Sequence, residues 1–111
     1  MREDSNMVEV TMTWDLRPDI DVEACANFSK VAVPKVLQVP GCREFRAHRN
    51  MLGSPHVRAT YVWQSLGECA NFQQTDAWQA LVPELNEYAT HVEIQLCGPS
   101  PVMPESLRPG S

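Results

Sequence analysis

The sequence contains no long apolar run and few basic residues. No apolar stretch exceeds three residues, as in Val31-Ala32-Val33, whereas a membrane-spanning helix needs about 20. Nine Lys and Arg stand against 14 Asp and Glu, for a net charge of −5, and the basic residues are scattered along the chain. Recognition of nucleic-acid phosphates needs clustered Lys and Arg. We therefore expect neither a membrane protein nor a nucleic-acid-binding protein.

Closely spaced catalytic and metal-binding motifs are also absent. The four cysteines are separated by 17, 27 and 28 positions, so none forms the short C-x2-4-C pair typical of zinc or redox sites. The chain has no phosphate-binding glycine loop, Ser-His-Asp order or paired-carboxylate motif, which removes most hydrolase, kinase and dehydrogenase functions. The opening residues MREDSN lack the apolar segment of a secretory signal. We expect a soluble, cytoplasmic protein whose cysteines are reduced thiols and which needs no metal.

Four segments alternate apolar and polar residues, the pattern of half-buried β-strands. They span residues 7–16, 42–51, 57–65 and 91–97. Gly53-Ser54-Pro55 predicts a turn that joins the second and third segments into a hairpin.

Two helices are predicted between these strands. Asp19 or Asp21 caps the first, which kinks or restarts at Pro34 and ends at Pro40-Gly41. The second runs from Gly67 to about Tyr88, with a further segment starting at Asp76 and an interruption at Pro83.

The order strand, helix, strand, strand, helix, strand corresponds to two split βαβ units. It predicts an α+β, ferredoxin-like βαββαβ domain over residues 7–97, with an antiparallel sheet of order 4-1-3-2 whose apolar sides all face the helices. Residues 1–6 are expected to be a disordered N-terminus. Residues 98–111 contain four prolines and are expected to be an extended arm or a disordered tail.

The opposite face of this sheet is polar, but Thr and Val are mixed among its charged residues. An antiparallel sheet can leave such a face in water. Alternatively, two copies pack these faces together around a two-fold axis, with cross-subunit ion pairs. The sequence leaves both arrangements open.

The strand-end motifs resemble a known family. Pro40-Gly41-Cys42, and Tyr61-Val62-Trp63-Gln64-Ser65 followed by a helix with Phe72, are similar to antibiotic-biosynthesis monooxygenase-like domains of the dimeric α+β barrel superfamily. The resemblance implies a homodimer in which two sheets form a barrel, and a pocket between helices and sheet in each subunit. Some members oxidise phenolic polyketides with molecular oxygen and no metal or flavin, and others degrade haem.

The resemblance disfavours haem degradation. The pocket tryptophan and haem-ligating histidine of that branch fall on Phe72 and Val82, which have no indole N–H and no iron ligand. It implies instead a cofactor-independent monooxygenase acting on a small aromatic or quinonoid compound. The alternative is a non-catalytic homodimeric module that binds a small ligand or mediates assembly.

Cofactor-free oxidation needs an aromatic pocket, a base for the phenolic proton and polar contacts for the developing anion. The candidate catalytic residues are His48 as base, with Tyr61 and Trp63 on the core face. His48 faces the barrel side by strand parity, away from Trp63. The candidate substrate-pocket residues are Trp14, Asn27, Phe72 and Trp78. The competing interpretation is that the Trp and Tyr rings simply fill the core.

Overall fold

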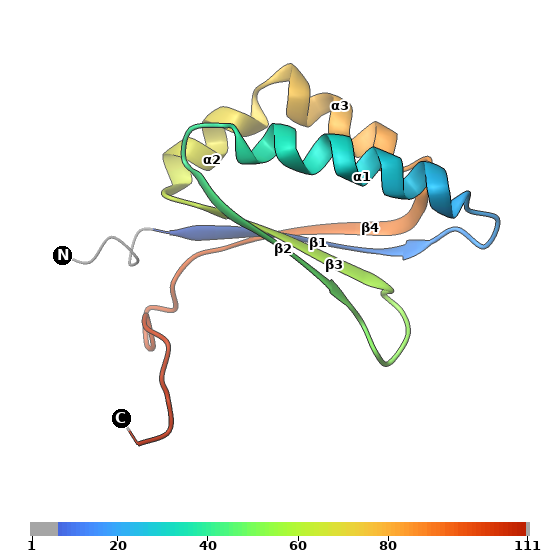
Figure 1. Cartoon of the computed structure of the whole chain (residues 1–111). Helices are drawn as coiled ribbons and strands as arrows, with labels where there is room; N and C mark the ends of the chain where they lie inside the picture. Colours follow the sequence, from blue (N-terminus) through green and yellow to red (C-terminus); the bar gives the residue numbers. More distant parts are fainter. Residues whose placement is uncertain (1–6, 111) are drawn as a thin grey trace.

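One four-stranded antiparallel sheet carries every helix on the same face (Figure 1). This computed structural model describes residues 7–110, so the predicted disordered N-terminus, residues 1–6, lies outside the described residues. The elements are β1 (Val8–Leu16), α1 (Val22–Leu37), β2 (Cys42–Arg49), β3 (Val57–Trp63), α2 (Leu66–Gln73), α3 (Asp76–Leu85) and β4 (Ala89–Cys97). The strand order β2-β3-β1-β4 is the predicted 4-1-3-2 order read from the other edge. The ferredoxin-like α+β fold is therefore confirmed.

Side-chain caps determine where the helices begin. The Asp21 carboxylate accepts a hydrogen bond from the Ala24 amide at 3.0 Å, satisfying one of the amides that a helix start leaves unpaired. Ser65 caps α2 in the same way, and Thr75 caps α3. The predicted helix from Gly67 to Tyr88 is therefore two helices, and the second begins at Asp76 as expected.

The prolines do not divide the helices as predicted. Pro34 lies in the last turn of α1, which continues as one helix to Leu37, and Pro83 lies close to the end of α3. Proline removes one backbone hydrogen bond, and near the C-terminal end this loss leaves most of the helix intact. The prediction that α1 restarts at Pro34 is wrong for this reason.

The hairpin strands are shorter than predicted. β2 ends at Arg49 rather than at residue 51, because Asn50 starts a turn. Its carbonyl accepts from the Gly53 amide at 3.3 Å, and its side chain accepts from the Leu52 amide at 3.1 Å. Met51, at the end of the predicted strand, is 82% exposed.

Gly41 explains the motif that precedes β2. Its φ of +92° is a conformation that L side chains rarely adopt, and a Cβ placed there would lie 2.6 Å from the Cβ of Glu68 on α2. The Gly41 carbonyl also accepts from the Gln64 amide at 2.7 Å. Only glycine allows this close approach between the start of β2 and α2.

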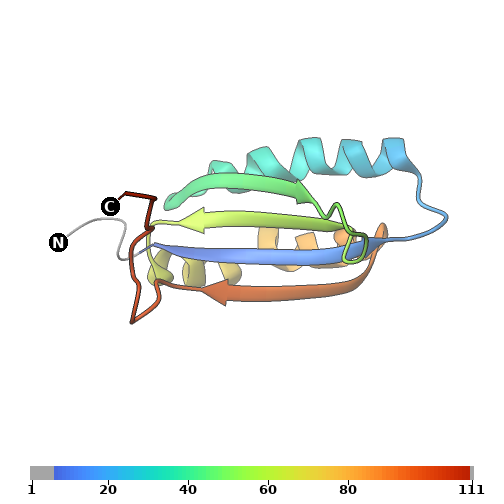
Figure 2. The same ribbon diagram turned by 90° about the horizontal axis from the view of Figure 1, so that it is seen from below.

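The core lies between the helices and the inner strands. Met12 and Trp63 are 2% and 1% exposed, and Cys69 and Phe72 of α2 are also buried. On β4, however, Ile94 and Leu96 are 43% and 46% exposed. Figure 2 shows β4 along one edge of the sheet and α1 along the opposite edge, beside β2. Ile94 and Leu96 pair with Met12 and Val10 and therefore lie on the covered face with them, as predicted. They are exposed because the helices leave this edge strand partly uncovered.

The face of the sheet away from the helices, here called the open face, has a charged surface over a buried centre. Arg46 contacts Glu9 and Glu44, at 2.5 Å in each case. The hydrogen bond to Glu9, and to a smaller extent that to Glu44, raises the pKa of the Arg46 guanidinium. Thr60 and Val62 of the central strand β3 are only 4% and 8% exposed.

Residues 98–110 form no helix or strand and leave the sheet on the side of the open face (Figure 1). Among the described residues, no helix combines the length and the apolar character required to cross a membrane.

Candidate functional site

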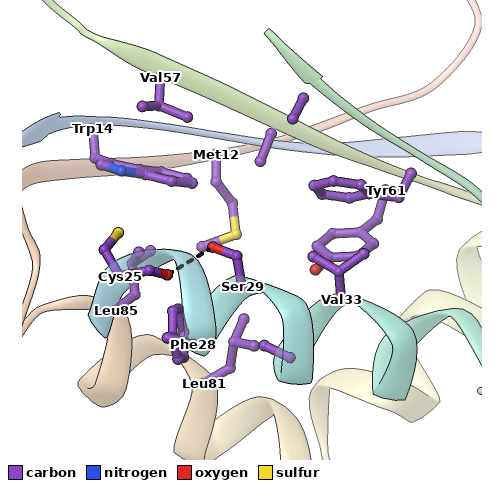
Figure 3. A pocket seen from close by; sticks show the side chains of 14 residues that line it. Met12, Trp14, Cys25, Phe28, Ser29, Val33, Val57, Tyr61, Leu81 and Leu85 are labelled. Carbon is purple, nitrogen blue, oxygen red and sulfur yellow. Dashed lines mark hydrogen bonds between the residues drawn. The ribbon is translucent and has the colours of Figure 1, made fainter. Parts of the chain in front are cut away.

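An apolar cavity of about 160 Å³ lies between α1, α3 and the covered face of the sheet. We call it the sheet–helix pocket, and Figure 3 shows its side chains. It is lined by Met12, Trp14, Cys25, Phe28, Ser29, Ala32, Val33, Phe45, Ala47, Val57, Ala59, Tyr61, Leu81 and Leu85. None of these residues carries a charge at neutral pH. The pocket therefore suits an uncharged or weakly polar ligand rather than an ionic one.

The few polar groups of the pocket remain protonated near neutral pH. Burial, and then the nearby Cys42, raises the pKa of Tyr61 to about 12. Burial also raises the pKa of the Cys25 thiol. The Ser29 hydroxyl donates to the Cys25 carbonyl at 3.2 Å, drawn as a dashed line in Figure 3. The lining thus supplies hydrogen-bond donors but no base that is active near neutrality.

Trp14 lines the pocket and carries an unpaired polar atom. Its Nε1 is fully buried and has no hydrogen-bond partner among the described residues. An indole N–H is a donor only. Buried polar groups are almost always paired, so this unpaired N–H is unusual.

The structure divides the predicted pocket residues among three places. Trp14 and Tyr61 line the sheet–helix pocket. Asn27 and Phe72 line an adjoining groove of about 550 Å³ between α1 and the other two helices, which shares Phe28, Ala32 and Leu81 with the pocket. Trp78 lines neither of these cavities.

Trp63 and Trp78 belong to an aromatic row in the core. Trp63 stacks on Phe72 with ring centroids 5.1 Å apart, and Phe72 meets Trp78 edge-on at 5.8 Å. Such offset and edge contacts stabilise packed rings. Trp63 is absent from the lining of the sheet–helix pocket.

His48 lies on the open face of β2. Its neighbour Ala47 lines the sheet–helix pocket, and successive strand residues point to opposite faces. The side chain of His48 is exposed and borders a shallow hollow with Thr13 and Arg58. The sheet therefore separates this imidazole from the pocket.

A polar cluster at the end of β1 was not anticipated from the sequence. Asp15 Oδ1 accepts from Ser54 Oγ at 2.6 Å and lies 3.7 Å from His56 Nδ1, while Oδ2 lies 3.2 Å from His91 Nδ1. The hydrogen bond from Ser54 is the main cause that lowers the pKa of Asp15, and the two histidines lower it further. Together they outweigh partial burial, which raises it. His56, exposed beside the hairpin turn, accepts from the Leu16 amide at 3.0 Å.

No sequence motif marks this cluster because an irregularity in the sheet creates it. The pairing of β1 with β4 shifts register between Thr13 and Asp15. Opposite this shift, His91 has a φ of +55°, a conformation in which His is one of the more frequent residues after glycine. Among residues 7–110, no group of three or more His, Cys, Asp or Glu side chains is placed to hold a metal ion.

The sheet order and the helix-covered face define a ferredoxin-like α+β domain with an apolar pocket between its two layers. The family model for antibiotic biosynthesis monooxygenase matches residues 7–84, and the chain belongs to this family. A search of curated proteins returned no match.

Solved structures share the fold at low sequence identity. The hydroxynitrile lyase of Passiflora edulis is 8% identical, with a TM-score of 0.76 and coverage of 90% of this chain and 99% of that chain. A variant of SnoaB, a cofactor-independent oxygenase from Streptomyces nogalater, is 16% identical, with a TM-score of 0.70 and the same coverages. A dimeric protein of unknown function from Bacteroides fragilis is 17% identical, with a TM-score of 0.63 and coverages of 83% and 95%. Since the fold supports both a lyase and an oxygenase, it does not by itself determine the reaction.

Proposed function

We propose that the protein is a cofactor-independent monooxygenase that oxidises a small aromatic or quinonoid compound in the sheet–helix pocket. The observation that carries the proposal is the uncharged, aromatic-lined cavity in a chain of the antibiotic biosynthesis monooxygenase family. Membership of the family and the similarity to SnoaB support the reaction class.

The volume of the pocket limits the size of the substrate. At about 160 Å³, it compares with an apolar cavity of about 150 Å³ that accommodates benzene in another protein. One aromatic ring therefore fits, while any further part of the ligand extends toward solvent. Phe28 and Phe45 supply ring faces and edges for such a ligand.

The substrate itself supplies the electrons for this reaction. A hydroquinone and one O₂ give a hydroxyquinone and one water: the two hydroxyls become carbonyls, one ring C–H becomes C–OH, and the second oxygen atom leaves as water. Four electrons pass from the ring to oxygen, so no external reductant is consumed. The role of the pocket is to bind and orient the ring and to exclude bulk water.

His48, Tyr61 and Trp63 remain the proposed catalytic residues, with different roles. Tyr61 lines the pocket and stays protonated, so it donates a hydrogen bond to a substrate oxygen rather than accepting a proton. Trp63 lies in the core, stacked on Phe72 and outside the pocket lining, so its proposed role is to position the core strands that line the pocket. His48 is on the open face, so a role as base requires a proton path from the sheet–helix pocket across the sheet.

We also propose a homodimer in which two open faces pack together. The contacts of Arg46 with Glu9 and Glu44 balance the charges on this face, so that two such faces can pack without uncompensated charge. The dimeric protein from Bacteroides fragilis, which shares the fold, supports a dimer.

A non-catalytic binding module is the second candidate, favoured by the lack of a neutral-pH base in the pocket lining. Oxygen consumption with single-ring hydroquinones, compared with the rate without protein, separates the two. With ¹⁸O₂, the oxygenase is expected to form a hydroxyquinone carrying one ¹⁸O atom. Binding of the hydroquinone without consumption of oxygen above the background would favour the binding module.

A further inference from the structure

We propose that a basic hollow on the open face binds the phosphate group of a small molecule. The hollow lies beside the β2–β3 turn and has a volume of about 360 Å³. Its polar lining residues are Thr13, His48, Arg49, Asn50 and Arg58, and we call it the arginine hollow. It lies across the sheet from the sheet–helix pocket, so the inference does not depend on the reaction proposed for that pocket.

The charge of this hollow is opposite to that of the chain as a whole. The chain carries 14 Asp and Glu against nine Lys and Arg, yet two arginines and no acidic residue among those the structure describes line the hollow. Neither guanidinium group, of Arg49 or of Arg58, makes a hydrogen bond or an ion pair with another of residues 7–110. Because carboxylates are in excess elsewhere, two unpaired guanidinium groups in one hollow indicate a negatively charged ligand.

Another arginine on the same face provides a contrast. Arg46, in the next row of the sheet, contacts two carboxylates. In its own row, Arg58 lies between His48 on β2 and Thr13 on β1, neither of which is acidic. Glu93 follows beyond Thr13 on β4 and forms no ion pair with Arg58 in the described part of the chain. A bound phosphate would supply the missing negative charge, including when two open faces pack as proposed.

The chemistry of the lining favours a phosphate group. A guanidinium group presents its N–H donors in a fork that matches two phosphate oxygens. Asn50 uses its side-chain oxygen to accept from the Leu52 amide, which leaves its NH₂ group to donate to a ligand. Two permanent positive charges suit a phosphate, which carries about two negative charges near neutral pH. The hollow is also within the size range of small-molecule sites, about 300 to 1,000 Å³, so the organic part of the ligand fits beside the phosphate.

Two probes of the same shape test the inference. Methyl phosphate is doubly charged at about pH 7.5, whereas methyl sulfate carries a single charge. Each is titrated calorimetrically into the full-length protein at constant ionic strength, in a buffer without phosphate. We expect saturable binding of methyl phosphate, tighter than that of methyl sulfate. No saturable binding of methyl phosphate, or equal affinity for the two probes, would overturn the inference.

Variants locate the site. Arg58→Gln should weaken the binding of methyl phosphate by about 10- to 100-fold, the range for a hydrogen bond to a charged group. Lys30→Gln is the matched control, because it removes the same charge from an exposed position on α1, on the other side of the sheet. It should leave the affinity unchanged. Equal losses in the two variants would mean that only net charge matters, and would overturn the inference.

Nuclear magnetic resonance of the unsubstituted protein provides a measurement that needs no variant. In the ¹⁵N-labelled full-length chain, methyl phosphate should shift the amide resonances of Arg49, Asn50 and Arg58 saturably and leave those around Lys30 unchanged. Shifts confined to other parts of the chain would overturn the inference, even if Arg58→Gln fails to fold.

These experiments need no turnover. A protein that binds methyl phosphate in the arginine hollow but consumes no oxygen with hydroquinones would contradict the proposed oxygenase alone. A protein that oxidises hydroquinones without binding methyl phosphate would contradict the phosphate site alone.

Discussion

The Nδ1 atom of His91 on β4 lies 3.2 Å from the Oδ2 atom of Asp15 on β1. On its other oxygen, Asp15 accepts a hydrogen bond from Ser54 at 2.6 Å, and His56 lies nearby. One carboxylate therefore connects β1, the β2–β3 turn and β4 at the same end of the sheet. This connection makes the stability of the fold dependent on pH.

Asp15→Asn should lower the melting temperature near neutral pH and reduce its dependence on acidic pH. The folded protein holds the pKa of Asp15 below its ordinary value of 3.8. The carboxylate therefore stabilises the fold above that value, and the contribution is lost as pH falls through the lower folded pKa. Thermal unfolding between about pH 7 and about pH 2 measures the effect.

Asp19→Asn is the matched control, because Asp19 is exposed before α1. The difference in melting temperature between the unsubstituted protein and Asp15→Asn should narrow on acidification. Parallel pH profiles of the melting temperature for the unsubstituted protein and Asp15→Asn would contradict the role assigned to Asp15.

Tyr61→Phe should abolish the part of the alkaline loss of stability that comes from ionisation of the Tyr61 phenol. The pKa of Tyr61 rises from 10.0 to about 12 on folding, so the unfolded chain releases the phenolic proton first. The free energy of unfolding should then fall between about pH 10 and about pH 12, by about 3 kcal/mol, and level off above this range. Denaturant unfolding across this interval, compared with Tyr61→Phe, measures the difference. If both proteins lose stability equally, the phenol is not held protonated by burial.

His48→Gln should leave the affinity for a single-ring hydroquinone unchanged, because the imidazole lies across the sheet from the pocket. If His48 is the base, the rate of oxygen consumption should fall by about 10²- to 10⁴-fold, the usual range for general-base catalysis. An unchanged rate as well as an unchanged affinity would remove His48 from the proposed mechanism.

Truncation after Cys97 should weaken the proposed homodimer. The removed segment presents Val102, Met103 and Leu107 at 83%, 63% and 72% exposure, and an arm that crosses to a second subunit would cover these side chains. Sedimentation equilibrium of the full and truncated chains measures the dimer dissociation constant. Unchanged sedimentation of the truncated chain would show that the arm makes no contribution.

Local patterns in the sequence predicted much of the fold. The period-two alternation located all four strands, since side-chain direction along a strand follows from backbone geometry. Asp21 marked the start of α1 because a carboxylate pairs with the free amides there. The Pro40-Gly41-Cys42 and Tyr61-to-Ser65 segments led to the correct family.

The sequence did not predict what depends on distant contacts. Ile94 and Leu96 have the alternation of core residues, yet their exposure follows from the position of β4 at the edge of the sheet. His56 lies next to a turn, and its contact with Asp15 requires the hairpin to reach β1.

By itself, the sequence determined the element order, the ferredoxin-like topology and the aromatic residues available for a pocket, because these depend on residue type and local periodicity. Only the tertiary structure decided that Trp14 and Tyr61 share one cavity while Trp63 fills the core. It also decided that the Trp14 N–H is unpaired and that Asp15 lies beside His91. These relationships depend on helix placement and on the register shift between β1 and β4, which bring together residues far apart in the chain.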